Sequence, residues 1–293
     1  MSSRTRDRHA FLNPSAIPAD DGVRPLFQVI PIPYEATVSY GHGTARGPRA
    51  ILDAARYLEE FDGRSIPGEA GIRVRPAVRV AGRRPTQLFS AITKAVRETA
   101  GEGSIPVLLG GEHSITAGAV RAFAGARRRL GVVHFDAHSD LRDTYQGSRH
   151  SHACAIRRVL DLGVPVFQIG VRSLYRHDTE VRRRLRVGHL DADEIARRGI
   201  PKTILPAGFP RDIYISFDID AFDCSLMPST GTPEPGGLFW NDAIAALERV
   251  VRRRRVVGFD VVELAPIRGL HAPDYVAARL VYSIMGMIVR GMA

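Results

Sequence analysis

Short apolar runs along the chain alternate with longer segments in which apolar residues recur every three or four positions. The first run, residues 27–33, reads FQVIPIP and predicts a core strand bounded by prolines. Pro48 then suits the first turn of a helix, where the missing N–H of proline is no loss. The same patterns predict further strands at 72–80, 105–109, 131–136, 166–170, 213–218 and 256–262, and helices at 50–61, 87–100, 115–126, 151–162, 179–186, 241–251 and 274–292.

Strands that alternate with helices predict a mainly parallel sheet, because parallel neighbours need a crossover that a helix usually provides. We therefore expect a three-layer α/β/α fold with helices on both faces of one central sheet. No repeat and no linker divides the chain, so residues 23–293 are predicted to form a single domain. Residues 1–22 are interpreted as a polar N-terminal tail, and Asn241 as the N-cap of its helix.

The composition is that of a globular protein, with 44% hydrophobic and 25% charged residues. No apolar run reaches the roughly 18 residues that a membrane-spanning helix needs, so no membrane partner is expected. The N-terminus lacks the apolar core of a secretory signal. Only Cys154 and Cys224 occur, which gives no disulfide framework and favours the reducing cytoplasm as the location.

A formal net charge of +10 invites the hypothesis of a nucleic-acid partner, but the pattern of basic residues argues against it. Lysine occurs only at Lys94 and Lys202, so the excess of arginine runs through the whole chain. The clusters at 127–129 and 252–255 follow predicted helices, where they complement the negative end of a helix dipole. No nucleic-acid-binding motif is present, and we expect no such partner.

The most informative segment, residues 132–140, reads VVHFDAHSD. Asp136, His138 and Asp140 are spaced two residues apart, so an extended strand would place all three on one face. Two carboxylates and an imidazole would repel one another there unless a cation sat between them. Because an apolar strand leads directly into this segment, we favour a metal site over a surface turn.

Two further predicted strand ends carry residues of the same kind. Residues 110–114 read GGEHS and present His113, which alone would more often be a buried, hydrogen-bonded histidine. Asp218 and Asp220 follow another strand and could alone bind calcium or cap a loop. Taken together, these side chains suit manganese, iron, nickel or zinc, and their number suits two ions about 3.5–4 Å apart. The set is His113, Asp136, His138, Asp140, Asp218 and Asp220. The implied chemistry is metal-assisted hydrolysis.

From about residue 30 to its end, the chain resembles the ureohydrolase family, which includes arginase and agmatinase and hydrolyses guanidino groups with two manganese ions. All three motifs of the family occur in order. The strings PIPYEATVSYGHGTARGPRAI (31–51) and DAHSDLRDTYQGSRHSHACAIRRV (136–159) are similar to the agmatinase branch. The resemblance implies an arginase-like fold, a catalytic domain at 23–293, two Mn²⁺ with Ni²⁺ as an alternative, and a homotrimer or homohexamer.

The resemblance also implies a role for each ligand. Asp136 and Asp218 would bridge the two ions. His113 and Asp140 would complete one ion, and His138 with Asp220 the other. Asp140 would also orient the attacking hydroxide. Both ions would thus depend on Asp136 and on Asp218.

Two further residues match catalytic positions of the family. His152 would shuttle a proton to the leaving amine, with His150 as the rival candidate, and Glu263 would pair with the substrate guanidinium. A carboxylate after an apolar strand would otherwise be a buried charge in need of a partner. Cys154 lies near His152, but without an oxyanion motif we do not expect a cysteine nucleophile.

The resemblance favours agmatine as the substrate, cleaved to putrescine and urea. Guanidinobutyrate, guanidine and formiminoglutamate are alternatives, as is a catalytically silent binding protein, although a silent relative would be expected to lose ligands. The chain departs from the family after Asp223, where residues 224–227 read CSLM instead of beginning with proline. We expect this to alter the rigidity of the loop rather than the chemistry.

Overall fold

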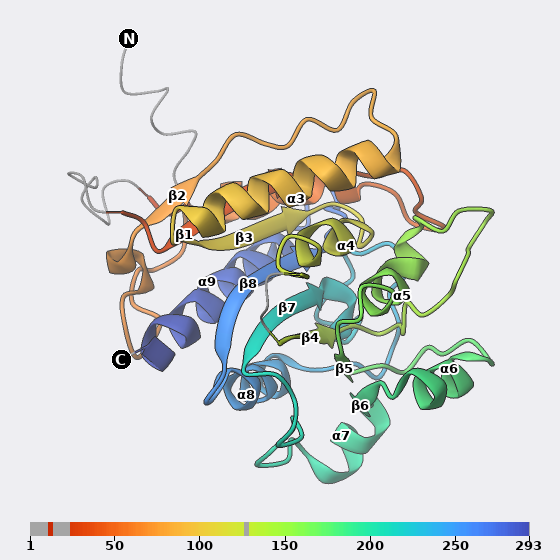
Figure 1. Cartoon of the computed structure of the whole chain (residues 1–293). Helices are drawn as coiled ribbons and strands as arrows, with labels where there is room; N and C mark the ends of the chain where they lie inside the picture. Colours follow the sequence, from red (N-terminus) through yellow and green to blue (C-terminus); the bar gives the residue numbers. More distant parts are fainter. Residues whose placement is uncertain (1–10, 14–23, 126–128, 293) are drawn as a thin grey trace.

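The computed structural model describes residues 11–13, 24–125 and 129–292, and its core is one parallel sheet (Figure 1). The strands lie in the order β2-β1-β3-β8-β7-β4-β5-β6, and every neighbouring pair is parallel. This confirms the predicted parallel sheet. The strands are β1 (Phe27–Ile32), β2 (Ile72–Val74), β3 (Ile105–Gly110), β4 (Leu130–Phe135), β5 (Val166–Ile169), β6 (Gly188–Leu190), β7 (Asp212–Asp218) and β8 (Arg255–Val262).

Helices cover both faces of the sheet, which confirms the three-layer fold (Figure 1). Each face buries its own apolar cluster against its own helices. One face carries α3 (Pro85–Gly101), α4 (Ile115–Val120), α5 (Ala155–Leu160) and α6 (Asp178–Leu185). The other carries α2 (Gly47–Ala55), α7 (Ala192–Arg198), α8 (Trp240–Val251) and α9 (Ala272–Met292). The 3₁₀ turns are η2 (Thr44–Arg46), η3 (Pro67–Ala70), η4 (His152–Cys154) and η5 (Ile219–Ala221).

Several elements differ from the prediction. Strand β2 is shorter than 72–80, because Pro76 cannot donate to a ladder. The pair β6 and α7 was not predicted, since β6 has three residues and α7 reads ADEIARR, with little apolar periodicity. Asn241 is not an N-cap: α8 begins at Trp240, and the Asp242 carboxylate accepts the N–H of Phe239 at 3.2 Å.

Parts of two predicted segments lie outside the described residues. Most of the predicted tail, residues 1–22, lies outside them, but Phe11 and Leu12 are described and buried. The Phe11 ring stacks on Tyr282 of α9, with 6.4 Å between ring centroids. Arg127 and Arg128 also lie outside the described residues. Among the described helices, none is long and apolar enough to cross a membrane.

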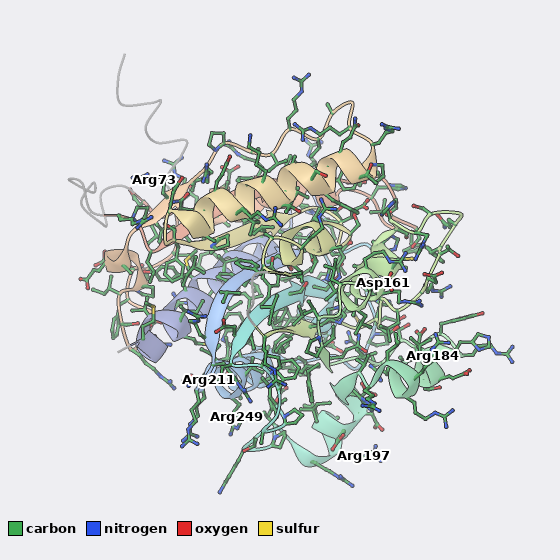
Figure 2. The ribbon with its side chains drawn as sticks, in the orientation of Figure 1. Arg73, Asp161, Arg184, Arg197, Arg211 and Arg249 are labelled. Carbon is green, nitrogen blue, oxygen red and sulfur yellow. The ribbon has the colours of Figure 1, made fainter. Side chains whose placement is uncertain are left out.

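The arginine-rich surface is dispersed over several elements. In Figure 2, Arg184 and Arg197 lie at the outer rim of the molecule, on α6 and α7. Arg197 pairs with Asp193 one helical turn away, at 2.5 Å. The predicted cluster at 252–255 follows α8, and Arg254 there donates to the backbone carbonyl of Phe209 at 2.6 Å. Arg197 therefore pairs within its own helix, and Arg254 binds the segment that precedes β7.

Helix α9 is fastened to the loop after α2 by a buried carboxylate. Asp62 accepts the N–H of Ser65 at 2.8 Å and a guanidinium N–H of Arg290 at 2.5 Å. Gly286 makes this approach possible, because a Cβ there would lie 2.1 Å from an Asp62 oxygen. Burial alone would raise the pKa of Asp62, but Arg290 and the backbone N–H groups hold it below its ordinary value of 3.8.

We predict that Asp62→Asn lowers the free energy of unfolding at pH 7 by about 1–3 kcal/mol, because a charge-assisted hydrogen bond is lost. The pKa of Asp62 is lowered on folding, so its contribution is present above pH 3.8 and is lost as the pH falls through the folded value. Urea denaturation of both proteins would measure the difference. A difference that stayed constant below pH 3.8 would contradict this account.

Candidate metal centre

The predicted site residues gather at the carboxyl ends of four neighbouring strands, β3, β8, β7 and β4. His113 follows β3, Asp136 follows β4, Asp218 ends β7 and Glu263 follows β8. Carboxyl ends of parallel strands meet at one edge of a sheet, which is where open α/β sheets bind ligands. The insertion of β8 and β7 between β3 and β4 therefore brings together residues that are distant in sequence.

His113 stands at the centre of three carboxylates. Its Nδ1 lies 3.1 Å from Asp136 Oδ2, 3.3 Å from Asp140 Oδ2 and 3.1 Å from Asp218 Oδ2. Its Nε2 lies 2.9 Å from Ser216 Oγ, which itself donates to Asp260, so Nε2–H donates to Ser216. Nδ1 is buried and makes no hydrogen bond within the described residues. A second proton on the ring, a protonated neighbouring carboxyl or a bound cation would satisfy it.

A second group of possible ligands shares Asp136 with the first. His138 Nδ1 lies 2.9 Å from Asp220 Oδ2 and 3.4 Å from Asp136 Oδ1. Asp136 thus faces His113 with one oxygen and His138 with the other, as a bridging ligand would. Asp218 differs, because its Oδ2 faces His113 while its Oδ1 accepts the N–H of Asp220 at 2.9 Å and faces no histidine among the described residues. Bridging by Asp218 stays a prediction, as do the ligand roles themselves.

The carboxylates of the cluster need positive charge beside them. Burial, together with the charges of Asp220 and Asp136, raises the pKa of Asp218 well above its ordinary value. Burial by itself would lower the pKa of His113, but the surrounding carboxylates raise it well above that of a free histidine. Protons and divalent cations compete for such a site. Imidazole and carboxylate donors without cysteine fit the metals predicted above.

The backbone is strained at two of the site residues. Asp140 has a φ of 52° and Glu263 a φ of 66°, a left-handed conformation that residues other than glycine rarely adopt. Each is held in place, because the Asp140 carbonyl accepts the N–H of Arg157 at 3.0 Å and the Glu263 N–H donates to Gly111 O at 2.8 Å. Such strain is characteristic of functional sites.

Glu263 faces the same cavity as the cluster. A cavity of about 400 Å³ is lined by Asp140, Asp218, Asp220, His152 and Glu263. Glu263 Oε1 accepts the backbone N–H of His113 at 2.5 Å, and burial raises the pKa of this carboxyl well above its usual range. The structure therefore places a buried carboxylate beside the cluster, where a cationic group could enter.

His152 lines the cavity, and its rival does not. Its backbone N–H donates to Thr37 Oγ1 at 3.0 Å, and its Nδ1 lies 3.4 Å from the same oxygen. Thr37 Oγ1 in turn donates to the fully buried Glu112 at 2.8 Å, a residue for which no role was predicted. His150 packs its ring edge against Phe89 instead, with 5.4 Å between ring centroids.

Cys154 is unsuited to act as a nucleophile. The side chain is fully buried, and burial raises the pKa of its thiol to about 11. A thiolate is the reactive form of cysteine, and it is scarce at neutral pH when the pKa is so high.

The loop after β7 is held by two residues despite its departure from the family. Asp223 accepts the N–H and hydroxyl of Ser225 and the N–H groups of both glycines at 236 and 237. Arg172 donates to the carbonyls of Asp220, Phe222 and Glu234, at 2.8 to 3.1 Å. Asp218 and Asp220 thus remain in the cluster. The effect of residues 224–227 on substrate choice stays a prediction.

A row of polar side chains, which the sequence did not reveal, crosses the sheet one layer below the ligands. Gln168, His134, Ser216 and Asp260 are paired in register across β5, β4, β7 and β8, and all are fully buried. His134 also belongs to a group of possible ligand atoms within 4.8 Å of one another, together with Asp136. Polar residues inside apolar strands were the available signal, and His134 and Ser216 each lie two positions before a predicted ligand.

We predict that Asp136→Asn abolishes binding of both ions, because its two oxygens face both histidines. His138→Ala should remove the ion on the Asp220 side first. Metal analysis of protein reloaded with manganese would give the number of ions per chain. Arg197→Ala, which changes a rim residue, should keep the full content. Unchanged metal content in Asp136→Asn would rule out its assignment as a ligand.

The chain matches the arginase family over residues 26–286. It is 40% identical over 266 residues to an N(1)-aminopropylagmatine ureohydrolase of Thermus thermophilus, which covers 88% of this chain and 89% of the relative. It is 36% identical over 269 residues to the N(1)-aminopropylagmatine ureohydrolase of Synechocystis, with 88% and 87% covered. The agmatinase of Pyrococcus horikoshii is 35% identical over 268 residues, with 89% and 92% covered.

A solved structure agrees with these relatives. The agmatine ureohydrolase of Thermoplasma volcanium superposes with a TM-score of 0.82 at 32% identity, covering 91% of this chain and 90% of that one. The arginase of Medicago truncatula, at 26% identity, has a TM-score of 0.80 and covers 91% and 88%. The resemblance seen in the motifs therefore extends over the whole sheet and its helices. This chain is an enzyme of the arginase family, in its agmatinase branch.

Proposed function

We propose that the enzyme hydrolyses the guanidino group of agmatine, giving urea and putrescine, with two Mn²⁺ held by the six predicted ligands. The observation that carries the proposal is the convergence of two histidines and four aspartates around Asp136, with Glu263 in the same cavity. Two divalent ions in such a site act as Lewis acids and make hydroxide available at neutral pH. Nickel would accept the same donors.

Glu263 is proposed to receive the substrate guanidinium. A guanidinium matches a carboxylate in charge and in its paired donors. Glu263 Oε1 already accepts the N–H of His113, which leaves Oε2 as the oxygen for the substrate. Because burial raises the pKa of Glu263, an arriving cation would also favour its charged form. The guanidinium carbon would then lie over the ligand cluster.

His152 is proposed to give a proton to the departing amine. Thr37 donates its hydroxyl proton to Glu112, so its oxygen can accept a hydrogen bond from His152 Nδ1–H. Nε2 is then the nitrogen available to the cavity, and it lies 3.5 Å from the hydroxyl of Ser39, another lining residue. Proton transfer by a positioned histidine is worth about 10²–10⁴-fold in rate.

N(1)-aminopropylagmatine is a second candidate substrate, favoured by the names of the relatives from Thermus thermophilus and Synechocystis. It has the same guanidino end as agmatine with an aminopropyl extension, so the two compounds differ only at the outer part of the cavity. There, Arg142 lies between the rings of Tyr145 and Tyr175, at 4.7 and 4.6 Å from their centroids. All three side chains line the cavity that the predicted ligands share, so they are candidates for contact with the tail of either compound.

The resemblance also leads us to propose a homotrimer or homohexamer in the cytoplasm, with no nucleic-acid or membrane partner. Exposed aromatic side chains are what a contact between subunits would cover. Tyr57 is 79% exposed and Tyr275 41% exposed, and both line one shallow hollow between α2 and the start of α9.

We predict manganese-dependent urea release from agmatine, from N(1)-aminopropylagmatine or from both. Metal-stripped protein would be reloaded with manganese or nickel and tested also with arginine, guanidinobutyrate and guanidine. The proposal requires agmatine to be cleaved with a kcat/KM in the enzymatic range, about 10⁴ M⁻¹s⁻¹ or more. A preference for the extended compound would support the second candidate. Turnover of guanidinobutyrate or guanidine alone would reject both.

We predict that His152→Ala lowers kcat about 10²–10⁴-fold while metal content stays unchanged, because the residue acts on a proton and not on the ions. The matched control is His150→Ala, which removes a histidine that lies near His152 in sequence but packs on Phe89. It should leave kcat within a fewfold of the wild type. Equal losses in the two variants would argue against the shuttle.

A further inference from the structure

His134 lies directly beneath the shared carboxylate. It is fully buried on β4, two residues before Asp136, and its Nε2 is 2.7 Å from Asp136 Oδ2. This is the oxygen that also faces His113 Nδ1 at 3.1 Å. His134 could therefore be a metal ligand itself or a hydrogen-bond donor to a ligand. Its other nitrogen decides between these roles.

The neighbouring strand fixes the tautomer of His134. Gln168 on β5 is its partner in register, and the Gln168 amide nitrogen lies 3.1 Å from His134 Nδ1. The Gln168 Oε1 accepts from Arg182 Nε at 2.8 Å, and arginine can only donate. The Gln168 amide nitrogen therefore donates to Nδ1, which leaves the His134 proton on Nε2. That proton points at Asp136.

The chain of hydrogen bonds continues to an ion pair between a buried arginine and a partly exposed aspartate. Arg182 on α6 is only 4% exposed, and its Nη1 donates to Asp191 Oδ2 at 2.9 Å. Arginine is rarely buried unless it is paired, so this placement needs both the amide oxygen of Gln168 and the carboxylate of Asp191. The hydrogen bond from Arg182 thus fixes the orientation of the Gln168 amide, so that its oxygen and nitrogen cannot exchange places.

We propose that His134 is a positioning residue for the metal centre, and that Gln168 and Arg182 hold it in the donating tautomer. The inference rests on the proposed metal centre. The Nε2–H of His134 fixes the plane of the Asp136 carboxylate, so that Oδ2 faces His113 while Oδ1 faces His138. Both ring nitrogens are occupied, which excludes His134 as a ligand in this arrangement. Groups that orient a ligand typically change metal affinity 10–100-fold when removed.

The chain offers a matched control at the opposite side of the sheet. Gln28 on β1 is also buried, at 2% exposure, and also sits in a polar network. Its amide nitrogen donates to Glu102 at 2.6 Å and Ser104 at 3.0 Å, and its oxygen accepts from Arg75 at 3.1 Å. None of these partners touches the ligands. Gln28→Met and Gln168→Met therefore both remove a buried amide from a polar network, but only Gln168 contacts a residue that touches a predicted ligand.

The test measures the affinity for manganese by competition with a chelator, and the number of ions per chain, in His134→Phe, His134→Gln, Gln168→Met and Gln28→Met. We expect His134→Phe to bind two ions about 10–100-fold more weakly than the wild type. His134→Gln, which keeps an N–H, should bind more tightly than His134→Phe. Gln168→Met should be weakened by a smaller factor, and Gln28→Met should match the wild type.

Three outcomes would overturn the inference. Wild-type affinity in both His134→Phe and Gln168→Met would show that neither residue positions Asp136. Clean loss of one ion in His134→Phe, with normal affinity for the other, would make His134 a ligand. Equal weakening in Gln28→Met and Gln168→Met would reduce the effect to general stability. Failure of the wild type to bind manganese or nickel would instead refute the proposed metal centre, which separates the two failures.

Discussion

The rest of this structure depends on one constraint, the concentration of carboxylates that are buried from solvent at one edge of the sheet. Asp136, Asp140, Asp218, Asp220 and Glu263 are all at most 8% exposed, within one edge of the sheet. Carboxylates so placed repel one another and lose their hydration, so each needs a partner of positive charge or an N–H donor. Histidines and backbone N–H groups meet part of that need, and His113 Nδ1, which has no hydrogen-bond partner among the described residues, faces three of the carboxylates. The parallel order of β3, β8, β7 and β4 is what makes the concentration possible.

The predicted ligands could be found from the sequence because each lies at or near the end of a recognisable apolar strand. Residues that can bind a metal stand at the end of an apolar strand in both segments, Asp136 to Asp140 and Asp218 to Asp220. The expected extended spacing does not continue through them, because β4 ends at Phe135, Asp140 has a φ of 52° and Asp220 lies in η5. Their meeting could not be derived from spacing alone. Nothing local says that β8 and β7 come between β3 and β4. The types and number of the side chains suggested a single centre, and the family resemblance supported it.

The supporting layer escaped prediction for a physical reason. Glu112, Gln168 and Asp260 act through partners 34 to 144 residues away, and a lone polar residue in an apolar strand has many possible partners. The segment of β6 and α7 escaped for a different one, since short elements with few apolar residues are stabilised by the tertiary contacts they make. Asp191, just before α7, nevertheless anchors the buried arginine behind Gln168. The segment of β6 and α7, which has few apolar residues, thus supports the clearly patterned strand β4 and the predicted ligands that follow it.

The Arg172 side chain has a consequence for attempts to redesign this enzyme. Its guanidinium donates to the carbonyls of Asp220 and Phe222, at the start of the loop after β7, and of Glu234, near its end. Both halves of this loop are therefore joined to Arg172, which follows β5. A loop transplanted here from a relative would bring its own carbonyl positions but not the matching donor. Chimeras that exchange residues 224–236 to alter substrate preference should therefore exchange the segment around Arg172 at the same time.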